Sequence, residues 1–101
     1  MNTVDIDVTV DAPMPEAQSR ILDRVDQRLR SVGFTGRQLD RTVLVYRPKF
    51  VGLPLVWLVR RLQNEHVAFT FTEQGSVTGV RAAGRLRDRA HAEVTEALGG
   101  R

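Results

Sequence analysis

The chain has 101 residues, of which 42% are hydrophobic and 27% are charged, a size and composition typical of one globular domain and unlike disordered or fibrous chains. It contains no cysteine, which excludes disulfides, thiolate metal sites and cysteine nucleophiles, and makes a reducing, cytoplasmic setting the expected one. The net charge is +3. Residues 37–61 alone carry +5, so positive charge gathers in the middle of the chain.

The first two expected elements are a strand and a helix. Residues 3–10 alternate strictly between valine or isoleucine and polar residues, a pattern that predicts a half-buried strand and is unlike an export signal. A helix is expected to begin near Pro15, because proline is tolerated in the first turn. Its apolar residues recur every three or four positions up to Val32, and Gly33 is the expected stop. Two acid–base pairs at four-residue spacing predict ion pairs on its exposed side, Glu16 with Arg20 and Asp26 with Arg30.

Two hairpins and a second helix are expected in the rest of the chain. The first hairpin joins residues 34–38 and 42–47, and the second joins residues 66–72 and 77–83 through a turn that contains Gly75. A closing helix should then bury a stripe of apolar residues and end at Gly99. The stripe is Leu86, Ala90, Val94, Ala97 and Leu98.

The predicted fold is therefore a single α+β domain over residues 1–101. It has an antiparallel sheet in β-α-β-β-β-β-α order, helices on one face, and an apolar insertion between the third and fourth strands. This order resembles the helix-grip arrangement of TATA-box-binding-protein-like domains. The resemblance implies a fold and no function.

No motif indicates catalysis, a metal or a cofactor. The serines lack the context of a nucleophile, and the two histidines show no paired spacing for zinc. His66 is expected at a strand edge and His91 on the surface of the last helix. Asp5 and Asp7 lie two apart on one strand face and could share a cation, but a solvated strand face is the favoured interpretation. The sequence thus favours a protein that is not an enzyme.

One weak anion-binding candidate lies near the start of the last helix. Arg85, Arg87 and Arg89 bring positive charge there, where the helix dipole already favours anions. The ordinary alternative is a solvated face on which Arg89 pairs with Glu93. Nucleic acid is not favoured as a partner, because only 6% of the residues are aromatic and few rings can stack on bases.

The most unusual segment is the apolar run from Phe50 to Val59, which basic residues flank on both sides. At about half the length of a membrane span, it is expected to cover the core or to make a contact. Its candidate partner-binding residues are Phe50, Leu53, Leu55, Val56, Trp57, Arg60 and Arg61.

The leading functional hypothesis is a small interaction module that contacts a protein partner or a second copy of itself through residues 47–62. Three alternatives stay open. The segment could be a connector that covers the core, it could lie on an anionic membrane surface as a peripheral anchor, or it could close a pocket for an apolar ligand.

Overall fold

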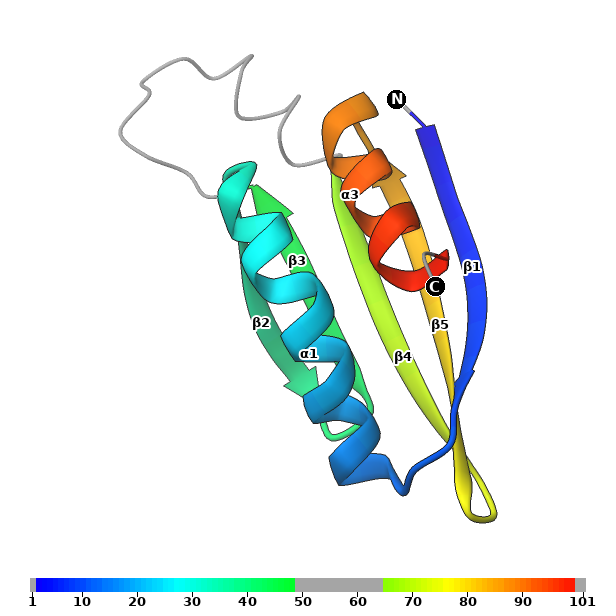
Figure 1. Ribbon diagram of the computed structural model, residues 1–101. Coiled ribbons are helices and arrows are strands. Elements are labelled where there is room, and N and C mark those ends of the chain that lie inside the picture. Colours follow the sequence, from blue (N-terminus) through cyan, green and yellow to red (C-terminus); the bar gives the residue numbers. More distant parts are fainter. Residues whose placement is uncertain (1, 49–64, 100–101) are drawn as a thin grey trace.

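The computed structural model describes residues 2–48 and 65–99, which form five strands and two helices (Figure 1). The strands are β1 (Asn2–Val10), β2 (Phe34–Asp40), β3 (Val43–Pro48), β4 (His66–Gln74) and β5 (Val77–Leu86). The helices are α1 (Met14–Ser31) and α3 (Asp88–Gly99). The predicted order of elements is confirmed. The apolar run from Phe50 to Val59 lies outside the described residues.

The five strands form one antiparallel sheet in the order β1-β5-β4-β3-β2. Helix α1 connects the two edge strands and lies over the β2–β3 side, while α3 lies over β5 and β1 (Figure 1). Both helices cover the same face of the sheet, as predicted from the sequence. Between them and the sheet is a continuous apolar core whose largest fully buried side chains include Tyr46, Phe69, Ile21, Leu29 and Leu86.

The local sequence explains how α1 begins and ends. Pro13 is its N-cap in an extended conformation, and Pro15 lies in the first turn, where a missing N–H costs no hydrogen bond. After Ser31 the chain turns through Gly33, whose φ of +89° lies in the region that side chains with a Cβ disfavour. The N–H of Gly33 donates to the carbonyl of Arg30 and closes the last turn. Both predicted ion pairs form, at 2.9 Å for Arg20–Glu16 and 2.8 Å for Arg30–Asp26.

The boundary between β5 and α3 differs from the prediction. Leu86 was expected in the helical stripe, but it is the last residue of β5 and pairs with Asn2 of β1. Leu86 lies four residues before Ala90, a spacing that also fits a helix. It is buried because alternate side chains of β5 point toward the core. Helix α3 starts at Asp88, whose carboxylate accepts a hydrogen bond of 2.6 Å from Asn2 Nδ2.

Candidate functional site

No described element covers the second face of the sheet, which we call the open face (Figure 1). Because side chains alternate along a strand, the residues that pack under the helices and those that point away can be separated from the strand register. The open face consists of Thr3, Asp5, Asp7 and Thr9 of β1, Val77, Gly79, Arg81, Ala83 and Arg85 of β5, His66, Ala68, Thr70, Thr72 and Gln74 of β4, Val43, Val45 and Arg47 of β3, and Thr35, Arg37 and Asp40 of β2.

One transverse row of this face runs through all five strands. Each neighbouring pair is a direct register partner, so the row is continuous from one edge of the sheet to the other. In sheet order its members are Asp5, Ala83, Ala68, Val45 and Arg37. An acid therefore lies at one edge, an arginine at the other, and three small or medium apolar side chains between them. We call these five residues the central row.

The acidic edge of the open face is partly neutralised within the chain. The guanidinium of Arg81 contacts Asp5 Oδ1 at 3.1 Å, and Asp7 is the direct cross-strand neighbour of Arg81. Two carboxylates thus flank one arginine, and one negative charge remains. The side chains of Asp5 and Arg81 are 58% and 60% exposed, so this ion pair adds little to stability and its charges remain available to a partner. The solvated strand face expected for the two aspartates agrees with this exposure.

The opposite edge is basic. Arg37 and Arg47 border a hollow of about 270 Å³ together with Thr35 and Leu39, and Val45 forms its floor. Val45 is only 7% exposed although it points away from the helices. Neither arginine forms an ion pair with an acid of residues 2–48 or 65–99. Sequence reasoning did not single out Arg37 or Val45, because only the register shows that they share a row.

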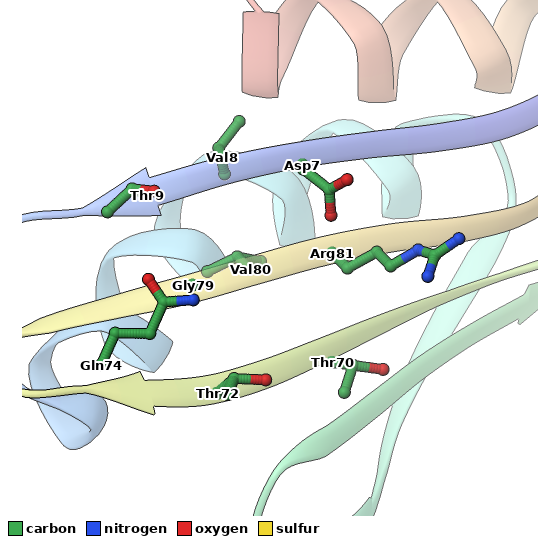
Figure 2. A pocket seen from close by; sticks show the side chains of 9 residues that line it. All are labelled: Asp7, Val8, Thr9, Thr70, Thr72, Gln74, Gly79, Val80 and Arg81. Atoms are coloured by element: carbon green, nitrogen blue, oxygen red, sulfur yellow. The ribbon is translucent and has the colours of Figure 1, made fainter.

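A second, polar depression of about 470 Å³ lies beside the central row. Figure 2 shows its lining, with Asp7 and Thr9 of β1 on one side and Thr70 and Thr72 of β4 on the other. Gly79 leaves the floor without a side chain, and the amide of Gln74 lies above it. The open face thus offers hydroxyl, amide and charged groups around a small apolar centre.

The three arginines expected to form an anion site do not share one surface. Arg85, which was expected near the start of the last helix, belongs to β5 and lies on the open face. Arg87 is paired, because its guanidinium lies 3.5 Å from Glu65 Oε2 and its backbone N–H donates to Glu65 Oε1 at 3.0 Å. Arg89 lies in the first turn of α3. Strand β5 extends to Leu86, past its predicted end at residue 83, so Arg85 lies in the sheet while Arg89 lies in α3.

One smaller expectation changes. Glu93 pairs with Arg28 of α1 at 3.3 Å, not with Arg89, because α3 packs beside α1 and turns Glu93 toward it. His66 lies at the edge of its strand, as predicted: it is the first residue of β4, and its register partner is Arg85 of β5. Within residues 2–48 and 65–99, no group of three or more histidine, aspartate or glutamate side chains gathers as a metal site.

A partly buried hydrogen bond joins the sheet to α1. Tyr46 is fully buried, and its hydroxyl donates to Asp26 Oδ1 at 2.7 Å. This hydrogen bond, together with Arg30, lowers the pKa of Asp26 below its ordinary value of 3.8 despite partial desolvation. Burial, reinforced by the Asp26 carboxylate, raises the pKa of Tyr46 well above 10.0. Both shifts lie on the helix side of the sheet and leave the open face unaffected.

The partner-binding residues predicted from the sequence lie outside the described part of the chain. They are Phe50, Leu53, Leu55, Val56, Trp57, Arg60 and Arg61. In the described ranges, no helix combines the length and the apolar character that crossing a membrane requires.

Comparisons with known proteins do not place the chain in a family. No protein-family model and no curated protein matches it. Among solved structures, it is similar to a solution NMR structure of a protein from Thermobifida fusca. The two share 14% sequence identity, with 98% of this chain and 83% of that chain covered and a TM-score of 0.41. That degree of similarity supports no assignment of family or function.

Proposed function

We propose that this chain is a non-enzymatic, cytoplasmic protein-binding module whose contact surface is the open face of the sheet. The central row carries the proposal. Small apolar side chains lie at its middle, and opposite charges lie at its two ends. An apolar centre with a charged rim is the usual organisation of a protein–protein contact, in which the rim charges fix orientation.

The charges of this face favour a protein surface over an anionic membrane. Asp5 and Asp7 lie on the same face as the arginines, and an anionic lipid surface would repel them. The middle of the face carries alanine, threonine and valine, which are too small to insert far into lipid. A protein partner with both positive and negative side chains can form ion pairs with the acidic edge at β1 and with the basic edge at β2 and β3.

The position of the aromatic side chains argues against single-stranded nucleic acid. Phe34, Tyr46, Phe69 and Phe71 all lie in the core under the helices. Among residues 2–48 and 65–99, no aromatic ring other than the imidazole of His66 lies on the open face, so little is available there for stacking on bases. The basic edge alone would supply phosphate contacts without base contacts.

A photo-activated cross-linking amino acid in place of Thr70, at the exposed centre of the open face, tests the proposal. The matched control carries the same amino acid in place of Arg24, an exposed residue of α1. Irradiation in living cells should give a defined protein adduct from the Thr70 position only, identified by mass spectrometry. Absence of an adduct, or equal adducts from both positions, would contradict the proposal. Co-sedimentation with phosphatidylserine vesicles in place of an adduct would replace it with membrane binding.

A further inference from the structure

We infer that the outer edge of β1 binds an extended segment of another protein, which adds to the sheet as a further antiparallel strand and alternates apolar with basic side chains. The inference goes beyond the proposed function, because it concerns the backbone edge of the sheet and not its open face. Strand β1 is an edge strand and, within residues 2–48 and 65–99, pairs only with β5 (Figure 1). Its outward N–H and C=O groups therefore have no strand partner in that part of the chain, and strand addition would satisfy them.

The direction of one hydrogen bond identifies the residues that carry these outward groups. Strands β1 and β4 are both antiparallel to β5, so they run in the same direction on opposite sides of it. In β4, the buried Phe71 donates its N–H to the carbonyl of Thr42, the residue before β3, and thus away from β5. In two strands of the same direction, residues that face the same side also direct their backbone groups to the same side. The core-facing residues of β1 therefore direct theirs toward β5. The outward groups belong to the residues of the open face, which are Thr3, Asp5, Asp7 and Thr9.

The β1 edge has few of the features that keep edge strands from pairing. It is nine residues long, its register with β5 is unbroken, and it contains neither proline nor lysine. The other edge strand, β2, has seven residues and a register shift between Gln38 and Asp40. Strand β1 is thus the longer and more regular edge for an added strand.

The charges of β1 select a basic partner. Directly opposite residues of an antiparallel pair lie on the same face, so the partner's side chains opposite Asp5 and Asp7 lie on the open face beside them. Asp5 contacts Arg81, whereas Asp7 forms no ion pair with a base of residues 2–48 or 65–99. Lysine or arginine opposite these acids neutralises the charge that Arg81 leaves over.

The helix side of β1 leaves apolar surface for the partner to cover. Ile6, Val8 and Val10 pack against the core but are only partly buried. In the same row of the sheet as Ile6, Ala82 of β5 and Phe69 of β4 are fully buried, because a strand lies on each side of them. Apolar partner residues opposite Ile6 and Val8 would complete this burial, and they alternate with the basic positions along the partner.

A second copy of this chain does not fit the same edge. If two β1 strands pair about a two-fold axis through Ile6, Asp5 of each copy lies opposite Asp7 of the other, and like charges directly opposite destabilise a pair. An axis through either aspartate places that residue opposite itself. Registers that keep the acids apart pair little more than half of the strand. The β2 edge of a second copy offers a single base, Arg37. The segment that fits is therefore a basic strand of a different protein.

Synthetic peptides test the inference on the wild-type protein. The probe has the sequence threonine-valine-lysine-valine-lysine-valine-threonine, which places its lysines opposite Asp7 and Asp5 and its central valine opposite Ile6. Titration followed by amide NMR should shift the amides of β1 and slow the hydrogen exchange of the outward N–H groups of Asp5 and Asp7. A matched peptide with glutamates in place of both lysines should bind at least about tenfold more weakly.

Methylation of selected peptide nitrogens tests the strand pairing separately from the charge. The lysines lie opposite Asp5 and Asp7, so their N–H groups face β1, and N-methylation of both should abolish binding. N-methylation of two valines, whose N–H groups point away from β1, should leave the affinity within a few-fold of the parent peptide. In the protein, Asp7→Asn should weaken binding of the lysine peptide several-fold, whereas Asp23→Asn on the exposed side of α1 should not change it.

Four outcomes would overturn the inference. They are an absence of shifts at low-millimolar peptide, equal binding of the lysine and glutamate peptides, equal loss of binding from both N-methylated peptides, and shifts confined to β2. Concentration-dependent shifts of the β1 amides in the protein alone would replace the basic segment with a second copy. None of these results affects the cross-link from Thr70, so the proposed function of the open face and the strand addition at β1 can fail separately.

Discussion

Replacing Tyr46 with phenylalanine should destabilise the fold by an amount that depends on pH. The hydroxyl of Tyr46 donates to the carboxylate of Asp26 at 2.7 Å, and the ring is otherwise held by core contacts that phenylalanine keeps. Hydrogen bonds to charged groups contribute about 1.5–3 kcal/mol when they are well shielded. The Asp26 side chain is 32% exposed and also contacts Arg30, so water and the arginine replace part of the loss. We expect Tyr46→Phe to cost about 1–1.5 kcal/mol at pH 7, or roughly 5 °C in Tm.

The pH dependence follows from the direction of the pKa shift. The pKa of Asp26 is lowered in the folded protein, so its ionised form stabilises the fold above the ordinary value of 3.8. That contribution is lost as the pH falls through the lowered pKa. The difference between wild type and Tyr46→Phe should therefore shrink toward pH 2, as the carboxyl of Asp26 takes up a proton and accepts a weaker hydrogen bond. Above pH 10 the raised pKa of Tyr46 has the opposite effect, and the wild type loses stability as the pH rises.

Urea unfolding followed by circular dichroism at pH 7 and pH 2 measures both values. Asp26→Asn and the double variant complete a thermodynamic cycle, in which the coupling between the two positions should be favourable at pH 7. An equal loss for Tyr46→Phe at both pH values would refute the role assigned to the ionised carboxylate. A loss below about 0.3 kcal/mol at pH 7 would show that water replaces the hydroxyl completely.

Two further substitutions test the packing that holds the sheet under the helices. In Gly36→Ala, the new Cβ would lie 2.7 Å from Cε2 of the Tyr46 ring, which is confined in the core, so unfolding should become easier by about 1–3 kcal/mol in urea titrations. A loss smaller than 0.5 kcal/mol would mean that the ring can move aside. In Thr78→Val, the buried hydroxyl that donates to the carbonyl of Ala12 at 2.9 Å is removed, and thermal unfolding should show a loss of about 1–2 kcal/mol. An unchanged Tm would show that this carbonyl needs no partner.

The sequence predicts the elements of this fold well, because each strand and helix carries its own period. The alternation from Thr3 to Val10 and the stripe of α1 fix which side of each element is buried, and that places both helices on one face. The prediction fails where two periods overlap. The spacing of Leu86 and Ala90 fits a helix, yet Leu86 is the last residue of β5. Arg85 therefore also belongs to this strand and not to the helix.

The sequence alone could not predict which residues lie side by side on the open face. Alternation shows that Asp5, Ala68 and Arg37 point to one side of their strands, but their common row depends on the register of four strand pairs. The register of β2 against β3 shifts between Gln38 and Asp40, where an extra residue leaves Leu39 exposed. A shift of this kind cannot be read from one strand alone. The electrostatic pattern of the face is therefore a property of the sheet and not of any segment.

The measurement that tests the central claim most directly is a titration followed by amide NMR, in which the partner identified by the Thr70 cross-link is added to the wild-type protein. If the open face is the contact surface, the amides of Val45, Ala68 and Ala83 should shift together as the partner is added. Amides on the exposed side of α1, such as that of Arg24, should stay in place. Spectra that do not change on addition of the partner, or shifts confined to the helices, would contradict the account.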